Sequence, residues 1–536
     1  MPDSKLRIDV LGTSVTIVSP ESPEYLSKLL ERLQSKIEET QKVTGLNDAL
    51  KIAVLTGFSL CDDIEKIKSE KNNDSRELES LALNLISRLD EVFESGNARN
   101  PRKNGKIHKL ANAVKNYPWG SPDWIPALLG EANPSRVPWA ELWMGVHPEG
   151  PSRAGGTLLS SLIEEEPLFY LGEDAEKNFG DLPFVFKVLA ALKPLSIQAH
   201  PNLEQAREGW ERENREGIAF DAPGRNYKDP NHKPEIICAL SPFKAMGGFR
   251  KTEDIQTLLG AFFKNAPVSL EPVFNRLDSA LSGKDGYPLK AFFRSLFDMN
   301  EDEQSALSGY AVSGKCGAEY PQYSKELELV SRLAELYPKD PAVIAPLYLN
   351  LIELEPGEAI YLPSGILHAY IHGLAIELMA NSDNVLRGGL TSKHIDKEEL
   401  FRILNFNPFK PSVLEAYPEE NFASDGSDFI ETPDLFEPAD LIKSDDKAGA
   451  PGFSYTYPVF CSDFSLTLLH GGALTYASSG PLIIIVTSGE LAIACAEQKL
   501  TLRKGESAFV PAGLAARKLK LSGNFTAYAA GTGAAL

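Results

Sequence analysis

The sequence has few cysteines, and they form no motif. Five occur among 536 residues, and no two stand in a CxxC spacing. An odd, scattered set does not make a disulfide framework, so we expect a reducing, cytoplasmic environment. Cysteine-ligated zinc is excluded as well, which leaves His, Glu, Asp or Gln to hold any metal. The five are Cys61, Cys238, Cys316, Cys461 and Cys495.

Long apolar runs are also missing. No stretch approaches the roughly 18 apolar residues that a membrane helix needs, and the N-terminus lacks the basic-then-apolar layout of a secretion signal. A formal net charge of −20 disfavours a general partner of nucleic acid or acidic membranes, because repulsion would oppose encounter. A small anionic substrate, held locally by a few Arg and Lys, is not excluded.

The first 95 residues differ in pattern from the rest. Two short β-patterns, 6–10 and 14–18, flank Gly12 and predict a hairpin. Ser22-Pro23-Glu24 then predicts a helix start. Apolar residues spaced three and four apart follow over 48–93 and predict a coiled-coil helix. Such a stripe favours pairing with a second copy of the chain; an intramolecular helical hairpin is the alternative.

Three stretches of this segment carry a family resemblance. They are RIDVLG at 7–12, PEYL at 23–26 and GLNDALKIA at 45–53. The arrangement resembles ZapA, the bacterial cell-division accessory protein. The resemblance implies a small α/β head, a dimerising coiled-coil tail and, as a partner, the tubulin-like division protein FtsZ. We therefore expect a homo-oligomer and a candidate FtsZ-binding module.

A metal-ligand pattern lies in the middle of the chain. Gly357 to His368 follows the spacing G-x5-P-x-G-x2-H. Gly357 turns the chain into a strand, and Pro363 with Gly365 makes the tight turn before the return strand. His368 then lies near the start of that strand, where alternation can point it into a barrel. This spacing is one of the two signatures of cupin barrels.

A second pattern supplies the remaining ligands. Gln198 and His200 are two residues apart, so on a strand they face the same side. Glu235 opens an alternating run after a proline. With His368 the set is one carboxylate, two imidazoles and one amide, which suits Zn²⁺ with positions left open for catalysis. Mn²⁺ or Co²⁺ would fit nearly as well.

The first of these spacings recurs near the C-terminus without its histidine. Gly505, Pro511 and Gly513 repeat the pattern, but Ala516 stands at the ligand position. Short β-rich runs at 482–486, 491–494 and 508–510 accompany it. We expect a second, metal-free barrel with a structural role. His470 is the only histidine in that part of the chain.

Several stretches between 117 and 405 carry a closer resemblance. This region is similar to the type I phosphomannose isomerase family. The resemblance implies reversible interconversion of mannose 6-phosphate and fructose 6-phosphate with one zinc, held by the four ligands above, and it places the catalytic arginine at Arg387. The stretches are YPWG (117–120), AELWMGVHP (140–148), LPFVFKVL (182–189), LSIQAHP (195–201), NHKPE (231–235), HAY (368–370) and SDNVLRGGLTSK (382–393).

The implied reaction assigns roles to further residues. Aldose–ketose isomerisation passes through an enediol, so oxyanion charge must be stabilised. Arg387 has too high a pKa for a base and is better suited to stabilise the enediolate or orient substrate. The base stays open between Glu377, expected on the strand after His368, Lys233, and a zinc-bound water. Candidate substrate contacts are Lys187, Ser196, Tyr370, Lys393 and His147.

Alternatives accompany several of these residues. A structural salt bridge explains Glu377 or Lys187 as well as catalysis does, and His372 and His394 are expected at the surface. A rival for the whole protein is an inactive sugar-binding or scaffolding cupin linked to cell division. A cupin oxygenase would normally show His-x-His and use iron. No Gly-rich nucleotide motif supports a guanylyltransferase.

Taken together, the patterns predict a multidomain chain, since 536 residues exceed one compact core. The expected fold class is cupin, or jelly-roll, β-barrels with a helical insertion, preceded by the α/β head and coiled coil. The expected boundaries are head and coiled coil 1–95, linker 96–107, catalytic domain 108–249 and 341–424, helical insertion 250–340, linker 425–449, and degenerate metal-free barrel 450–536.

Overall fold

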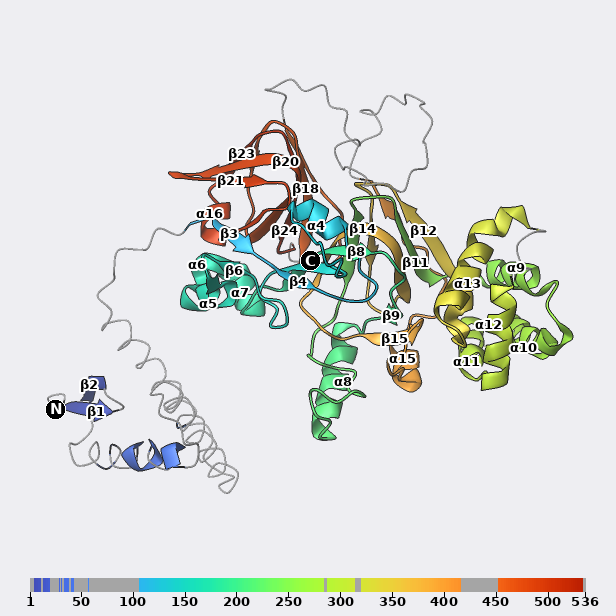
Figure 1. Cartoon of the computed structure of the whole chain (residues 1–536). Coiled ribbons are helices and arrows are strands. Elements are labelled where there is room, and N and C mark those ends of the chain that lie inside the picture. Colours follow the sequence, from blue (N-terminus) through green and yellow to red (C-terminus); the bar gives the residue numbers. More distant parts are fainter. Residues whose placement is uncertain are drawn as a thin grey trace. The chain divides into compact units, whose positions relative to one another are not determined.

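The computed structural model of the chain divides into two compact units, Met1–Lys103 and Asn104–Leu536. Figure 1 shows their helices and strands in colour along the sequence. The described residues are 4–10, 13–19, 28, 30, 33–37, 40–42 and 56 in the first unit, and 106–283, 287–313, 320–415 and 452–533 in the second.

The first unit begins with the predicted hairpin. Strand β1 (Ser4–Val10) pairs with β2 (Thr13–Ser19) in antiparallel register, with Val10 opposite Thr13. Residues 33–37 and 40–42 are helical, as the pattern after Ser22 predicts. The helix start at 22–24 and, apart from Thr56, the coiled-coil segment 48–93 lie outside the described residues, so both stay predictions.

One long strand, β14 (His368–Ala380), organises the first sheet of the second unit. Its C-terminal part pairs with β8 (Phe184–Ala191) and β10 (Glu235–Ala239), and its N-terminal part with β9 (Ile197–Ala199) and β11 (Phe243–Phe249). All these pairings are antiparallel. The sheet also contains β4 (Ala113–Lys115), β5 (Glu141–Met144), β12 (Leu349–Leu354), β13 (Ala359–Leu362), β15 (Leu386–Gly389) and β16 (Val413–Leu414).

Gly373 is where β14 changes partners. Its φ of +128° is a conformation that side chains rarely adopt, and a Cβ there would lie 2.6 Å from Phe243 Cδ2 and 2.8 Å from Pro242 O. Only glycine meets both conditions. The strand therefore continues through this point, and the prediction that Glu377 lies on the strand after His368 is wrong, because both residues belong to β14.

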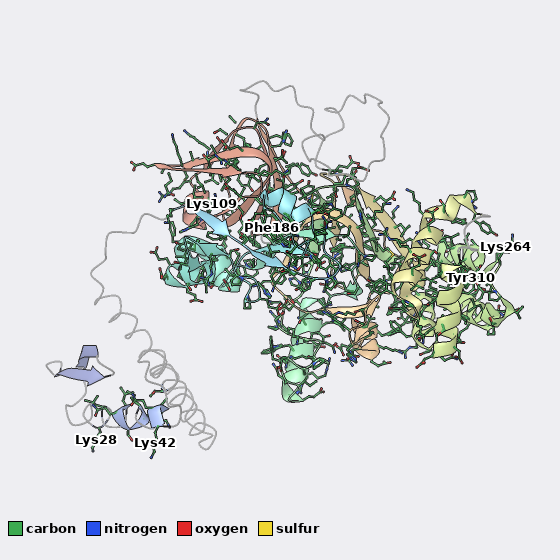
Figure 2. The ribbon with its side chains drawn as sticks, in the orientation of Figure 1. Lys28, Lys42, Lys109, Phe186, Lys264 and Tyr310 are labelled. Carbon is green, nitrogen blue, oxygen red and sulfur yellow. The ribbon has the colours of Figure 1, made fainter. Side chains whose placement is uncertain are left out.

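Helices fill the connection between β11 and β12, which are paired neighbours in the sheet. The insertion runs from Thr252 to Tyr348, beyond the expected end at 340. Tyr310, labelled in Figure 2, lies inside it, where its hydroxyl donates to Phe262 O (2.9 Å). Its elements are α9 (Thr252–Phe263), η1 (Val268–Leu270), α10 (Glu271–Ser282), α11 (Pro288–Phe297), α12 (Glu301–Val312), η2 (Pro321–Tyr323), α13 (Ser324–Leu336), η3 (Pro341–Ile344) and α14 (Ala345–Tyr348).

A second sheet follows in the C-terminal part, around β20 (Leu482–Cys495). This strand covers two of the expected short strands, 482–486 and 491–494, with a register shift between Val486 and Ser488. Its other strands here are β17 (Phe453–Thr456), β18 (Ser465–His470), β19 (Ala473–Tyr476), β21 (Gln498–Arg503), β22 (Ser507–Val510), β23 (Leu519–Ser522) and β24 (Phe525–Gly531).

This second sheet also receives strands from the start of the unit. Strand β3 (His108–Ala111) pairs with β22, and β6 (Arg153–Ala154) with β7 (Thr157–Leu158) extends the row. Lys109 on β3, labelled in Figure 2, forms an ion pair with Glu506 (2.6 Å). Residues expected in the catalytic domain thus contribute to the C-terminal sheet.

One apolar core joins the two sheets. It contains Phe186 of β8, which Figure 2 labels, and Ile236 and Cys238 of β10. Tyr457 and Phe464 of the C-terminal segment belong to the same cluster. The remaining helices are α4 (Trp124–Leu129), α5 (Leu159–Glu165), α6 (Pro167–Leu171), α7 (Glu173–Phe179), α8 (Leu203–Arg215), α15 (Lys397–Ile403) and α16 (Ala512–Ala515).

The described part of the chain is thus mostly antiparallel sheet with helices attached. Closure of each sheet into a barrel and the exact domain boundaries stay predictions. Among the described residues, no helix has both the length and the apolar character needed to cross a bilayer. The described cysteines, Cys238, Cys461 and Cys495, are buried and free.

We predict that Gly373→Ala lowers stability and Gly260→Ala does not. The first change forces a Cβ into Phe243 at a strained φ, which should destabilise by roughly 2–4 kcal/mol. Gly260 lies within α9 with open space around its Cβ, so alanine there should be neutral or stabilising by about 0.5–1 kcal/mol. Thermal midpoints of the two variants and the wild type test this. A Gly373→Ala midpoint equal to the wild type contradicts it.

Candidate metal centre

The four predicted ligands come from three neighbouring strands. Gln198 lies on β9 and His200 directly follows it, Glu235 begins β10, and His368 begins β14. His368 is opposite Gln198 in the β14–β9 pairing. The turn through Pro363 and Gly365 leads directly into β14, as the spacing predicts, and Gly365 has the expected positive φ of +80°.

Their polar atoms converge on one point. His200 Nε2 lies 3.3 Å from Glu235 Oε1, and His368 Nε2 lies 3.3 Å from Glu235 Oε2. The ligand atoms of these three residues all lie within 4.8 Å of one another. The amide nitrogen Nε2 of Gln198 lies 3.5 Å from His368 Nε2, and a flip of this amide presents its oxygen instead.

Hydrogen bonds at the far side of each imidazole set its orientation. Nδ1 of His200 lies 2.7 Å from the carbonyl oxygen of Asn384, and Nδ1 of His368 lies 2.9 Å from that of Ile366. A carbonyl oxygen can only accept, so Nδ1 carries the proton in both rings and Nε2 presents a lone pair toward Glu235. This is the orientation of histidine ligands to a metal.

Two atoms in this cluster lack a hydrogen-bond partner among the described residues. His200 Nε2 and Glu235 Oε1 are buried and make no hydrogen bond, although the Lys233 ammonium lies 3.0 Å from Glu235 Oε1 as an ion pair. Leaving buried polar atoms unpaired is unfavourable by about 1–3 kcal/mol each. A divalent cation would satisfy both at once, so the residues present fit a metal ion.

The protonation states also fit a metal. Burial, and then the nearby Lys233, lower the pKa of His200 to about 4, so its imidazole is neutral at pH 7. Burial opposes ionisation of Glu235, but Lys233 and the two histidines outweigh it and hold the pKa of this carboxyl well below its usual range. Neutral imidazole and ionised carboxylate are the forms that bind metals.

Asn384 holds the His200 side of the cluster together. Its side-chain oxygen accepts from the backbone N–H of Lys228 (2.7 Å), and its side-chain nitrogen donates to the carbonyls of Asp229 and Asn231 (both 2.8 Å). The residue is fully buried. Its own carbonyl, which orients His200, is therefore fixed by a saturated network.

A second buried cluster lies on the C-terminal part of β14. Glu377 is opposite Lys187 of β8, and Lys187 Nζ lies 3.1 Å from Glu377 Oε2 and 3.9 Å from Glu141 Oε1. Lys187 also lies over the ring of Trp143, whose indole N–H donates to Glu141 (2.7 Å). The salt bridge considered for Glu377 and Lys187 is therefore present.

Charge and burial act against each other in this second cluster. Burial opposes the charged form of Lys187, but Glu141, Glu377 and Glu235 outweigh it and raise its pKa. Burial is also the main cause that raises the pKa of Glu377, and Lys187 opposes it. The Lys187 ammonium is thus held in its charged form, while the pKa of the Glu377 carboxyl is raised above its usual value.

Three more predicted residues lie at these clusters. Lys233 Nζ is 3.0 Å from Glu235 Oε1, and the Tyr370 hydroxyl donates to Glu235 Oε2 (3.0 Å). His147 Nε2 lies 3.1 Å from Asp383 Oδ2 and its ring meets Trp143 edge-on. Tyr370 therefore faces the ligand carboxylate.

Arg387 is half-buried on β15, opposite Gln198 of β9. Within the described part of the chain, its guanidinium makes no hydrogen bond or ion pair. Burial lowers its pKa, yet a guanidinium stays charged at any physiological pH. An unpaired, half-buried cation beside a metal ligand is suited to an anionic ligand.

The other predicted residues are less involved. Ser196 is half-buried just before β9, whereas Lys393 is exposed beyond β15. His394 is exposed, as expected, but the surface prediction for His372 is wrong. Its ring is half-buried and lies edge-on to Trp124, with centroids 5.2 Å apart.

Glu141 and Asn384 were missed by reasoning from the sequence. Alternation along 141–143 places Glu141 and Trp143 on the same side of β5, and this signal was readable. Asn384 carried no signal, because its partners at 228–231 are distant in sequence.

A cavity of about 320 Å³, lined by Phe293, Asp340, Tyr348, Gly388 and Lys397 among others, contains none of the predicted site residues.

Comparison with known proteins places these observations in a family. Residues 107–252 match the family described as phosphomannose isomerase type I, catalytic domain, and residues 6–111 match cell division protein ZapA. Mannose-6-phosphate isomerase of Salmonella typhimurium is 39% identical over 414 residues, covering 76% of this chain and 95% of that protein. The human mannose-6-phosphate isomerase is 35% identical, covering 56% and 74%.

Solved structures agree. A lysine-to-alanine mutant of phosphomannose isomerase from Salmonella typhimurium has a TM-score of 0.67 at 34% identity, covering 80% of this chain and 100% of that one. A mannose 6-phosphate isomerase bound with zinc and yttrium has a TM-score of 0.65 at 35% identity, with the same coverage. The chain therefore belongs to the type I phosphomannose isomerase family.

Proposed function

We propose that the chain interconverts mannose 6-phosphate and fructose 6-phosphate, with one Zn²⁺ held by Gln198, His200, Glu235 and His368. One observation carries the metal site: His200 Nε2 and Glu235 Oε1 are buried 3.3 Å apart without a hydrogen bond, while backbone carbonyls occupy Nδ1 of both imidazoles. The family and its zinc-bound member support zinc and this substrate pair. Mn²⁺ or Co²⁺ would suit the same ligands.

The charges of the buried residues favour this arrangement. Glu141, Glu235 and Glu377 are three buried carboxylates, and Lys187 and Lys233 are two buried ammonium groups. With all five ionised their sum is −1, and a divalent cation changes it to +1. The metal-loaded centre thus attracts a sugar phosphate, whereas the metal-free centre repels it.

Proton transfer between C1 and C2 needs a base that works near neutral pH. Glu377 fits best, because burial raises its pKa toward that range. Lys233 is the other candidate in the chain, but its ammonium is paired with Glu235 (3.0 Å), and a protonated amine cannot accept a proton. A metal held by the four candidate ligands would supply Lewis-acid chemistry at the substrate oxygens.

Arg387 stabilises negative charge on the substrate. Its guanidinium is free of protein partners among the described residues, and its backbone pairs with that of the candidate ligand Gln198. It therefore pairs with the enediolate oxygen or the phosphate. Lys187 and Tyr370 position the two carboxylates Glu377 and Glu235, and His147, Ser196 and Lys393 stay predicted substrate contacts.

The rest of the chain surrounds this centre. We infer that both sheets of the second unit close as cupin-type barrels, the first catalytic and the second metal-free, with the boundaries expected from the sequence. The ZapA match and the β1–β2 hairpin support an oligomerising N-terminal segment that also binds FtsZ. The free, buried cysteines support a reducing, cytoplasmic setting.

Of the predictions that follow from this proposed function, the first concerns the metal. EDTA should abolish turnover of mannose 6-phosphate in a coupled assay, and Zn²⁺ should restore it. His368→Ala should lower kcat/KM at least about tenfold, or roughly 1.4 kcal/mol of barrier, because it removes a ligand. His394→Ala, at an exposed histidine, is the control and should keep full activity. Mass spectrometry should find one zinc per chain.

The same measurements distinguish the isomerase from the rival function, an inactive sugar-binding or scaffolding protein. An inactive sugar-binding or scaffolding protein would show no turnover in the wild type, with or without added zinc. Full activity of His368→Ala would contradict the ligand assignment even if the wild type is active.

The second prediction concerns the free arginine. Arg387→Ala should lower kcat/KM at least about tenfold, and Arg387→Lys should recover only part of it, because a lysine cannot reproduce the planar, two-pronged contact. Arg207→Ala, at an exposed position on α8, should leave kcat/KM unchanged. Equal activity of the two alanine variants would remove Arg387 from the mechanism.

The third prediction concerns the N-terminal segment. The full chain should be an oligomer by light scattering, and a chain that begins at Asn104, the start of the second unit, should lose that association while keeping its kcat. If light scattering gives the same number of chains per particle for the full and the shortened protein, residues 1–103 do not drive assembly.

A further inference from the structure

Strand β10 lies between the metal centre and the C-terminal sheet. Glu235, at its start, belongs to the ligand cluster. Ile237 and Ala239 pack in the core of the first sheet with Tyr370, whereas Ile236 and Cys238 pack with Tyr457, Phe464 and Tyr528 of the C-terminal segment. Because side chains alternate along a strand, one face of β10 packs inside the first sheet and the other face packs against the C-terminal segment.

The chain leading into β10 is held by an acidic residue of the C-terminal segment. His232 Nε2 lies 3.0 and 3.1 Å from the two carboxylate oxygens of Asp463. The side chains are only 25% and 12% exposed, so water screens the contact less than it would at an open surface. His232 directly precedes Lys233, which pairs with Glu235.

A second contact holds the other end of β10. The Tyr457 hydroxyl donates to Gly357 O (2.6 Å) and accepts from Cys238 Sγ (3.3 Å). Gly357 N in turn donates to Ala239 O, the last residue of β10 (2.9 Å). Both ends of this strand are therefore tied to side chains that come from the C-terminal segment.

We infer that the C-terminal sheet positions the metal centre, with Asp463 and Tyr457 as positioning residues that act through His232 and through Cys238 and Gly357. The inference rests on the metal site of the proposed function. It gives a role to a sheet whose described residues include none of the four candidate ligands: this sheet fixes the segment that carries Glu235 and Lys233.

The expected size of the effect follows from metal-site chemistry. Partners that orient ligands from outside the coordination sphere typically change metal affinity or activity by about 10–100-fold when removed. Asp463 acts through a histidine three positions before the ligand, so the lower end of this range is expected.

The test uses the full chain and measures zinc affinity directly. Asp463→Ala should weaken zinc binding about tenfold in competition with a chelator, and kcat at saturating zinc should fall. Asp463→Asn keeps an acceptor for His232 and should lose less. A His232→Ala, Asp463→Ala double variant should bind zinc no more weakly than the worse single variant, because both remove one contact.

Tyr361→Phe provides the matched control. It removes a hydrogen bond to Phe460 O (3.2 Å), another contact between the first sheet and the C-terminal segment, and it leaves the His232–Asp463 pair in place. It should leave zinc affinity unchanged, even where its thermal midpoint falls. A general packing role would weaken zinc binding in Tyr361→Phe as much as in Asp463→Ala.

The outcomes separate this inference from the proposed function. Wild-type zinc affinity in both Asp463 variants overturns the positioning role and leaves the isomerase assignment intact. If Asp463→Ala does not fold, the zinc affinity of Asp463→Asn alone decides whether Asp463 is a positioning residue. Weakened zinc binding in the Asp463 variants of a chain that never turns over mannose 6-phosphate would uphold positioning and reject the isomerase.

Discussion

A single buried carboxylate, that of Glu235, constrains the rest of the site. It has no exposed surface, and an ionised carboxylate taken out of water is strongly unfavourable unless it is paired. Its partners are His200, His368, Lys233 and the Tyr370 hydroxyl. These come from β9, β14 and the segment before β10. The antiparallel order β9, β14, β10 is therefore what makes the ionised carboxylate stable.

The same strand connects the ligand cluster to the second cluster. β14 carries His368 and Tyr370 before Gly373 and Glu377 after it. Because Gly373 lets the strand continue where its partners change, the candidate ligand His368 and the ion-paired Glu377 share one strand. Burial favours a raised pKa at both carboxyls. At Glu235 the nearby Lys233 and the two histidines outweigh burial and lower the pKa, whereas at Glu377 burial outweighs Lys187 and the pKa is raised. A buried carboxyl with a raised pKa, such as that of Glu377, is suited to proton transfer.

The sequence was sufficient where the information is local. The spacing from Gly357 to His368, the pair Gln198 and His200, and the strand start at Glu235 are short patterns, and the structure brings these residues together. The features that could not be predicted depend on contacts between residues that are far apart in the sequence. The partnership of β3 with β22, the contact of His232 with Asp463 and the network around Asn384 join residues far apart in sequence. The error at Glu377 is different: β14 is 13 residues long and continues through Gly373, so Glu377 lies on the same strand as His368.

The repeat near the C-terminus differs from the first in more than its missing histidine. Gly357 and Gly505 have similar φ values, +89° and +83°, so the first turn is preserved. The second is not: Gly365 has φ of +80° and leads into β14, whereas Gly513 lies within the short helix α16. Ala516 follows that helix and is exposed. A histidine at this position would lie outside the sheet, so restoring the residue would not restore a ligand. α16 instead packs on α6, where a Cβ on Gly513 would lie 2.7 Å from Phe169. The turn that leads to the candidate ligand His368 in the first sheet makes a packing contact in the second, which favours a supporting role for the C-terminal sheet over a lost metal site.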